Sequence, residues 1–446
     1  MFNHGFFPRL TSLFAVLYIA AGFGLFLSVA DNSLAKSGKL PLAPTVLAVL
    51  FLGSITSFVL LRDFLGRRAT TQVGMIVKSN TAVIFPFALL ALISLALALH
   101  PGAYWSDGQK WIYLQSYDFC IFIAAMLIPT VEAVRKHFQY FVIVGLLTLL
   151  GSIWYDVQNP GAYSSVPGRA SGFPGNSNWG ALSTVMLCTM SLSYQEGRAR
   201  LLDLAVMAVT ALGLYFTFSR SGTINFVLLL LFFCTVAILN GKNRAKTAIS
   251  LGLSLVSLIT FIVVVIPLAS KSSELTATSN KSQNRVLALA DGELSDDGSA
   301  ADRIEAARET LDRIENSPVF GNGTGFNRRM RQTPHNLYLK LWVDSGIFGL
   351  LTWLSLLASG FWMFTSRRYR PGQALMIATA FGCLFSHNIL EQRTFLILFG
   401  TASSMSLFAS AKHVARVNTA LKLNDMLEKR NVHRAASEPQ ALSSYR

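Results

Sequence analysis

The stretch Pro334 to Leu351 reads PHNLYLKLWVDSGIFGLL, a His-Asn pair that opens an otherwise apolar helix. The run after Asn336 has the character of a membrane-crossing helix, so His335 is expected at a membrane surface. Histidine has an ordinary pKa near neutrality and can take a proton from a hydroxyl group. The same position also suits a residue that caps the helix or anchors it among lipid headgroups. The charges elsewhere in the chain bear on which of these holds.

The composition predicts an all-α polytopic membrane protein. Of 446 residues, 52% are hydrophobic and only 14% are charged, and 32 are phenylalanine. Apolar runs long enough to cross a bilayer predict about twelve transmembrane helices. They are Leu10–Ala30, Leu42–Leu61, Ala82–Leu99, Ser116–Thr130, Phe138–Trp154, Asn176–Tyr194, Leu201–Phe216, Gly222–Leu239, Thr247–Leu268, Leu337–Thr365, Gln373–Ser386 and Phe395–Ser410.

Lysine and arginine in the short loops predict the orientation, because cytoplasmic loops are enriched in both. One alternate set of loops carries Arg62, Arg67, Arg68, Lys78, Arg135, Lys136, Arg198, Arg200, Lys242, Arg244, Lys246, Arg367, Arg368 and Arg370. The opposite set carries only Lys36, Lys39, Lys110, Arg169, Arg220 and Arg393. The first set is therefore expected to be cytoplasmic, and with it both termini.

This topology divides the chain into four parts. Residues 1–268 hold the first nine spans, 269–336 form one long loop on the outer face, 337–410 hold the last three spans, and 411–446 form a basic cytoplasmic tail. The net charge of +15 is accounted for by topology and by attraction to membrane lipids, so no nucleic-acid partner is predicted. The four cysteines all fall inside predicted spans, without disulfide or zinc spacing.

The long outer loop is expected to contain one amphipathic helix. Ala269 to Gly298 is polar and reads as a flap, whereas Ile304, Ala307, Leu311 and Ile314 recur at helical spacing. Such a helix would lie on the membrane or over a cavity. Arg303 has no acidic residue three or four positions away, so it is a candidate for binding an anion or for simple solvation.

Two further arginines lie on the same predicted face. Arg169 belongs to GRASGFPGNSNW, Gly168 to Trp179, and Arg220 belongs to FTFSRSG, Phe216 to Gly222. The second turn is too short to be a free loop, so Arg220 must lie near membrane depth, where charges favour a cavity or a partner over lipid. Snorkelling to the headgroups is the alternative for each.

Arginine forks suit phosphate oxygens, so several arginines beside one histidine suit a leaving group that departs as a diphosphate. No P-loop or dinucleotide motif is present in the sequence, which disfavours a soluble nucleotide donor. Asp291, Glu293, Asp296 and Asp297 form an acidic loop without a fixed geometry for a cation, so neither a metal site nor a cofactor is predicted.

These stretches together resemble the O-antigen ligase and polymerase superfamily. The resemblance rests on the two arginine turns, on DRIEAARETLDRIENSPVFGNGTGF from Asp302 to Phe326, and on the following HNLYL and DSGIFG. In the ligases it implies a C-type glycosyltransferase fold with twelve spans, in the bacterial inner membrane. Such enzymes move a polysaccharide from undecaprenyl diphosphate to a sugar of the lipid A core, on the periplasmic face and without metal.

Carried over by position, the resemblance implies that His335 is the general base, with inversion at the anomeric carbon. Arg169 and Arg220 would hold the diphosphate, with Arg303 as a third contact. Supporting or cavity-lining roles fall to Asn178, Ser219, Asn336, His387 and Arg393, although interfacial anchoring beside Glu391 suits the last two equally. Gly321, Gly323 and Gly325 would let the outer loop turn tightly, or simply make it flexible. Asp344 departs from the glutamate expected at its position.

Three functions remain in view. A ligase ranks first because the chain has a single large outer loop and no appended outer domain. A polymerase of O-antigen or exopolysaccharide uses the same chemistry but typically has two sizeable outer loops, whereas Tyr155 to Gly175 is modest. A lipid-linked glycan transporter would be expected to carry ionisable residues or broken helices at mid-membrane.

Overall fold

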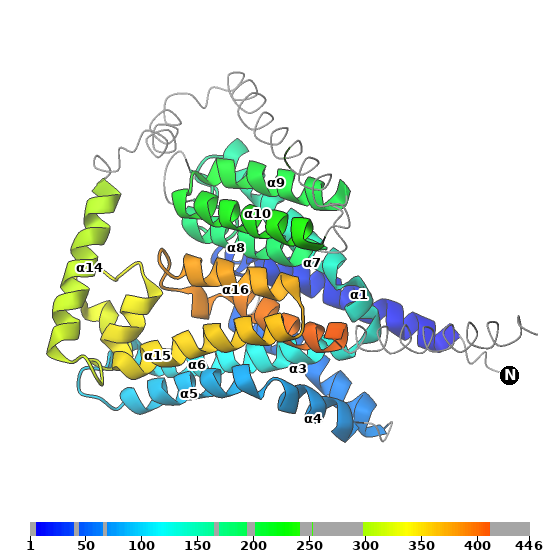
Figure 1. The fold of residues 1–446 in the computed structure, drawn as a ribbon, viewed down its shortest axis with the longest axis horizontal. Helices are drawn as coiled ribbons and strands as arrows, with labels where there is room; N and C mark the ends of the chain where they lie inside the picture. Colours follow the sequence, from blue (N-terminus) through cyan, green and yellow to red (C-terminus); the bar gives the residue numbers. More distant parts are fainter. Residues whose placement is uncertain are drawn as a thin grey trace, which may run out of the picture.

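The computed structural model describes residues 6–39, 44–65, 69–164, 169–193, 201–240, 252 and 298–410. Within these ranges the chain forms helices and their connections, and no strand (Figure 1). The principal helices are α1 Phe6–Leu27, α2 Ala30–Lys36, α3 Pro44–Leu65, α4 Ala69–Ser79, α5 Thr81–Leu97, α6 Trp105–Leu127, α7 Glu132–Gln158, α8 Ser177–Ser191, α9 Leu201–Thr217, α10 Arg220–Asn240, α14 Gly298–Asn316, α15 Leu337–Ser366 and α16 Arg370–Gly382. Short 3-10 turns follow as η1 Ile128–Thr130, η3 Phe326–Arg329 and η4 Ile389–Glu391, and a last helix covers 393–410.

The helices follow the predicted apolar segments. Each segment overlaps a helix except the ninth, Thr247–Leu268, which lies outside the described residues apart from Gly252, as do the flap at 269–297 and the tail at 411–446. Among the described residues three helices are long and apolar enough to cross a membrane, or five if two bent pairs each count as one span. The apolar helices indicate an integral membrane protein, and the number twelve stays a prediction.

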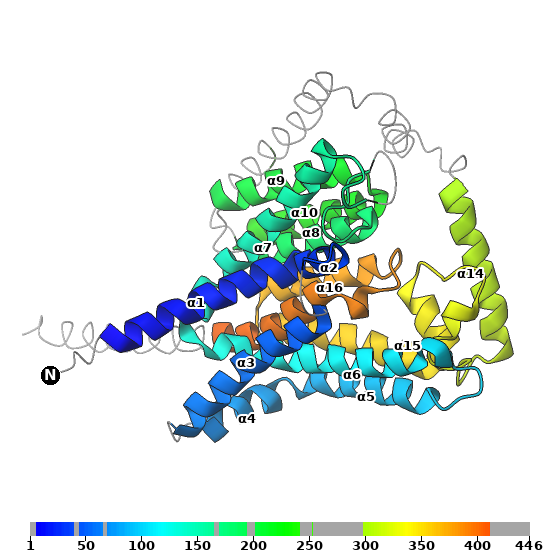
Figure 2. The same cartoon turned by 180° about the vertical axis from the view of Figure 1, so that it is seen from behind.

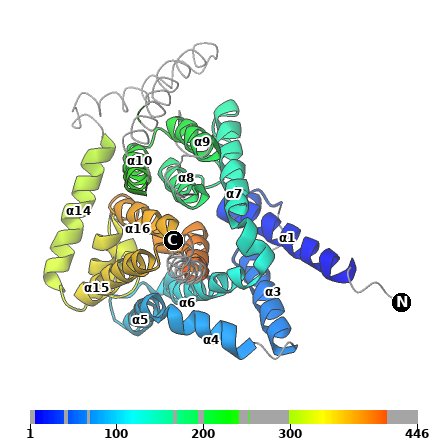
Figure 3. The same ribbon diagram turned by 45° about the vertical axis from the view of Figure 1, so that its right-hand side comes forward.

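Helix α8 lies at the centre of one half of the bundle. It packs against α7, α9, α10 and α16, and almost all of its residues are buried (Figure 3). Small side chains permit this close approach, as they do in membrane bundles generally. A Cβ on Gly222 at the start of α10 would lie 2.5 Å from Cβ of Ala181. The start of α10 is thereby held directly against the first turns of α8.

The other half of the bundle is built on α15, which packs along α5 and beside α16. Since α8 and α10 also pack on α16, this helix lies between the two halves (Figure 3). The first turns of α8, α10 and α15 and the last turn of α16 lie at one end of the bundle, called here the site end. Helix α14 stands across this end, beside the start of α15 (Figures 1 and 2).

The predicted amphipathic helix exists as α14, but its buried face differs from the predicted stripe. Ala306, Thr310 and Ile314 are buried, whereas Ile304 and Leu311 are 55% and 44% exposed. The prediction was wrong for Ile304 and Leu311, because contact with α15 decides which face of α14 is buried, and hydrophobicity alone does not. Arg303 precedes Ala306 by three positions and Thr310 by seven, so it shares the face that turns toward the protein.

A glycine-rich loop joins α14 to a break in α15. Gly321, Gly323 and Gly325 all have positive φ, between 73° and 103°, which corresponds to the tightly turning alternative of the two considered for this loop. Helix α15 is interrupted at Gly346, where φ is 64° and ψ is −167°. A Cβ on Gly346 would lie 2.0 Å from the carbonyl oxygen of Val319, so only glycine fits this close crossing.

Polar contacts close the same junction, called here the glycine clasp (residues 318–327 against 343–347). The backbone N–H of Asn322 donates to the Val343 carbonyl at 2.9 Å, and that of Gly323 donates to the Asp344 carbonyl at 3.0 Å. The buried Asp344 carboxylate accepts from the backbone N–H of Asn327 at 2.8 Å and from its side-chain amide. The two backbone bonds from Asn322 and Gly323 satisfy carbonyls that the helix break leaves without a partner in the helix. The two bonds from Asn327 explain the acidic residue at position 344.

Candidate functional site

The loop that carries Arg169 is organised by one buried carboxylate. Asp156, near the end of α7, accepts backbone N–H bonds from Tyr163 at 3.0 Å, Ser164 at 3.3 Å, Ser171 at 2.8 Å and Gly172 at 3.3 Å. Several N–H donors around one carboxylate fix the loop around it. The sequence analysis did not single out Asp156, because its donors are backbone groups that become neighbours only on folding.

Arg169 and the turn before Arg220 are joined through Asn178. The Arg169 guanidinium donates to the Thr217 carbonyl at 3.1 Å and to the Asn178 side-chain oxygen at 3.0 Å. The Ser219 hydroxyl donates to the same oxygen at 3.0 Å. Asn178 and Ser219 therefore lie beside Arg169, with Asn178 accepting and Ser219 donating in these contacts.

Arg220 is the first residue of α10. Phe218 has φ of 46°, which turns the chain sharply, and the Ser219 hydroxyl accepts the Gly222 backbone N–H at 3.2 Å. The open N–H groups of a helix start carry partial positive charge and suit an anion. The half-buried Arg220 adds a full charge at the same place. We call Arg169, Asn178, Ser219 and Arg220 the arginine half of the site.

His335 lies immediately before α15, as the sequence predicts. The Asn336 side chain caps this helix by accepting the backbone N–H groups of Tyr338 at 2.9 Å and Leu339 at 3.2 Å. The Leu337 N–H donates to the Cys383 carbonyl at 2.8 Å, which ties the start of α15 to the end of α16. The His335 side chain is exposed, and so accessible to a substrate.

His387 and Arg303 accompany His335. The two imidazole rings lie with centroids 5.4 Å apart in an edge-on arrangement. The pKa of His335 lies below its ordinary value because partial burial disfavours the charged form and because Arg303 is close enough to add its positive charge. Burial, together with the charges of Lys340, His335 and Arg328, lowers the pKa of His387 to about 3. We call His335, His387 and Arg303 the histidine half.

The two halves occupy the same end of the bundle, on either side of the last turn of α16. A Cβ on Gly382 would lie 2.7 Å from the Leu182 side chain, one turn after Asn178 in α8. The next residue, Cys383, holds the start of α15. The structure thus brings Arg169 to Arg220 and Arg303 to His335, and it sets the two pairs around one helix end.

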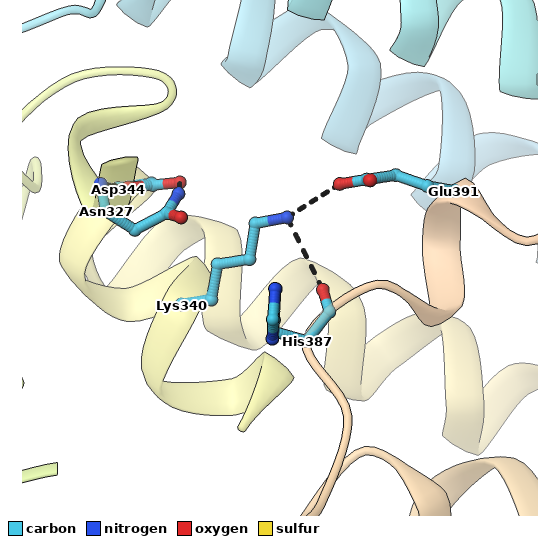
Figure 4. Close-up of polar contacts among 5 residues, drawn as sticks. All are labelled: Asn327, Lys340, Asp344, His387 and Glu391. Atoms are coloured by element: carbon cyan, nitrogen blue, oxygen red, sulfur yellow. Dashed lines mark hydrogen bonds and ion pairs between the residues drawn. The ribbon is translucent and has the colours of Figure 1, made fainter. Parts of the chain in front are cut away.

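A buried lysine beside the histidine half was missed by the sequence analysis (Figure 4). The ammonium nitrogen of Lys340 lies 2.8 Å from a Glu391 carboxylate oxygen and 3.4 Å from the His387 carbonyl oxygen. Asp118 and Asp344 line a cavity of about 20 Å³ next to this pair. One sequence signal could have revealed it. A lone lysine within an apolar helix is costly unless it has a partner.

Arg393 has a different environment from the one considered for it. Its guanidinium lies 2.6 Å from the buried Asp31 carboxylate and 2.8 Å from the Asn32 side-chain oxygen, both in α2. A 70° bend between α1 and α2, with Val29 at φ 63°, brings α2 to this position. Arg393 therefore joins two helices at the site end, and Glu391 is the partner of Lys340.

Comparison with known families accounts for the central part of the chain. Residues 205–354 match the family model described as O-antigen ligase. This match supports membership of the O-antigen ligase superfamily. The matched segment contains Arg220, Arg303, His335 and Lys340, whereas Arg169 and the segment around His387 lie outside it. A search of curated proteins gave no match to this chain.

No metal centre is evident in the part of the chain that the structure describes. No group of three or more His, Cys, Asp or Glu side chains there is arranged to hold a metal ion. The acidic loop with Asp291, Glu293, Asp296 and Asp297 lies outside the described residues.

Proposed function

We propose that this protein is an O-antigen ligase of the bacterial inner membrane. It transfers a polysaccharide from undecaprenyl diphosphate to a sugar hydroxyl of the lipid A core on the periplasmic face. The observation that carries the proposal is the gathering of two arginines and an arginine-flanked histidine at one end of the bundle, in and beside the segment that matches the O-antigen ligase family. The proposal includes the four-part organisation, with both termini in the cytoplasm and the site end in the periplasm.

The arginine half is suited to the diphosphate. A guanidinium held at Nε by the Thr217 carbonyl and at one terminal nitrogen by Asn178 has its plane fixed, and a guanidinium fork of fixed orientation suits phosphate oxygens. The start of α10 adds backbone N–H groups beside Arg220. In this scheme Arg169 and Arg220 stabilise the charge that develops on the leaving diphosphate, and Arg303 approaches it from α14.

The histidine half is suited to activating the acceptor. Its depressed pKa keeps His335 neutral at neutral pH, which is the form that accepts a proton. The acceptor O–H bond breaks and its proton passes to the imidazole, while the oxygen forms a bond to the anomeric carbon. The bond from that carbon to the diphosphate breaks, and its electron pair leaves with the diphosphate. Attack opposite to the leaving group inverts the anomeric centre.

Deletion of the gene tests the reaction in the cell. A ligase predicts that polysaccharide-capped lipopolysaccharide disappears while the full-length polymer accumulates on its lipid carrier. Accumulation of single repeat units would instead identify a polymerase, and an accumulation confined to the cytoplasmic face would identify a transporter. Transfer in membranes treated with a chelator should continue, because the proposed roles need no cation.

A further inference from the structure

The Lys340–Glu391 ion pair is largely shielded from water. Its side chains are 10% and 20% exposed, whereas those of Lys136 and Glu132, which pair at the same 2.8 Å on α7, are 67% and 64% exposed. Removing a charged pair from water carries a large desolvation cost. Such a cost within an apolar helix favours a specific task for the pair.

The pair connects the elements that carry the two histidines. Lys340 lies in the second turn of α15, five residues after His335, and Glu391 lies in η4, four residues after His387. The lysine also reaches the His387 carbonyl at 3.4 Å. With the Leu337–Cys383 hydrogen bond, these contacts hold the segment 383–391 against the start of α15 at both ends.

We infer that Lys340 and Glu391 are positioning residues that hold His387 edge-on against His335, so that removing either charge disturbs the surroundings of the His335 imidazole. The inference rests on the proposed role of His335 as general base. It extends that role by assigning two residues that do not touch the substrate. Figure 4 shows the lysine between Glu391 and the His387 backbone.

Charged groups from several elements surround the two histidines and the Lys340–Glu391 pair. His387 faces Lys340 from α15, Arg328 from η3 and His335 itself, while His335 also faces Arg303 from α14. Opposing these cations are Glu391 from η4 and the buried Asp118 from α6, which lines the same cavity as Lys340. With its pKa near 3, His387 is neutral at neutral pH, so it does not repel the proton that arrives on His335.

Opposite charge removals are expected to move His335 in opposite directions. Lys340→Met removes a cation and leaves Glu391 without it, so the pKa of His335 should rise. Glu391→Gln leaves the lysine charge uncompensated, so the pKa of His335 should fall. Each shift should be about half a pH unit or more, and the double variant should return toward the wild-type value.

The measurement uses carbethoxylation of His335 by diethyl pyrocarbonate, because only the neutral imidazole reacts. The full-length protein is purified in lipid nanodiscs and treated across pH 4.5 to 8, and modification of the peptide that contains His335 is followed by mass spectrometry. The matched controls are Lys136→Met and Glu132→Gln, which remove the exposed pair on α7 and should leave the His335 midpoint unchanged. Lys340→Arg keeps the charge and should restore the midpoint.

Shifts in the same direction, or no shift in either variant, would overturn the inference. Where Lys340→Met does not fold, Glu391→Gln decides alone: a fall in the midpoint supports the inference, and an unchanged or raised midpoint refutes it. Glycan transfer is assayed on the same samples. Transfer that survives His335→Ala refutes the proposed base, whereas loss of transfer in His335→Ala with unmoved midpoints in both charge variants refutes only the positioning role.

Discussion

The arginine half and the histidine half of the site are held in place by different means. Arg169, Asn178 and Ser219 are joined by direct hydrogen bonds between the starts of two helices that pack against each other. His335 and Arg303 come from a loop and from α14, beside the glycine clasp and the Lys340–Glu391 pair.

This difference has a functional meaning within the proposed reaction. A diphosphate needs donors in a fixed geometry, and short polar contacts supply it. An acceptor must enter and leave, so the proposed base, His335, lies in an exposed position. The glycine clasp and the Lys340–Glu391 pair lie beside it. Changes in the arginine half should therefore act through direct contacts, whereas changes in the histidine half should also act from a distance.

The largest effect is expected from His335→Ala. Loss of a general base typically costs about 10²- to 10⁴-fold in rate, so transfer of lipid-linked glycan in membranes should fall by at least about a hundredfold. The control is His137→Ala, since His137 is an exposed histidine on α7 away from the site end. Transfer at the wild-type rate by the His335 variant would remove the histidine half from the mechanism.

Arg220→Lys tests the arginine half. Lysine keeps the charge but loses the paired N–H groups that bind phosphate oxygens, so transfer should fall by roughly tenfold or more. Arg331→Lys is the control, because Arg331 is exposed and pairs with Glu305 at 3.1 Å on α14. Equal activity of Arg220→Lys and wild type in a membrane transfer assay would show that charge alone suffices at this position.

Gly346→Ala tests whether the glycine clasp supports the histidine half from a distance. The new methyl group meets the Val319 carbonyl at a backbone conformation that alanine rarely adopts, so the protein should lose about 1–3 kcal/mol of stability. Gly151→Ala is the matched control, since a Cβ at this helical position meets nothing within 4 Å and alanine favours the helix. Thermal unfolding in nanodiscs distinguishes the two, and equal melting temperatures would argue against a strained clasp.

The smallest expected effect concerns pH and His387. Its folded pKa of about 3 lies below the ordinary 6.5, so between these values the unfolded chain binds more protons and acid favours unfolding. Stability contributed by neutral His387 is full above pH 6.5 and declines as the pH falls toward 3. From pH 7 to pH 5 the decline should be about 1–2 kcal/mol. His387→Asn should reduce this decline in thermal unfolding at the two pH values, and an unchanged decline would contradict the buried neutral form.

Much of the architecture could be predicted from local pattern. Apolar runs of membrane-spanning length became helices because a hydrophobic segment satisfies its own backbone in that form. The Asn336 cap and the three glycine turns follow from residue types with strong local preferences. Arg220 at the start of α10 was recognisable because charges at membrane depth are rare.

Other features depended on contacts between distant parts of the chain. The buried face of α14 was misjudged because Ile304 and Leu311 match the helical period but lie away from α15. Lys340 and Glu391 are separated along the chain by a complete helical hairpin. Arg393 and Asp31 are separated by most of the chain. No spacing rule links such residues.

By itself the sequence determined the helical class, most helix positions and the choice of His335 and the arginines, because hydrophobic length, helix caps and charge depth are local properties. Only the tertiary structure decided which charges are paired and which face of α14 is buried. Pairing of buried charges depends on which helices are neighbours, and packing of the whole bundle decides that.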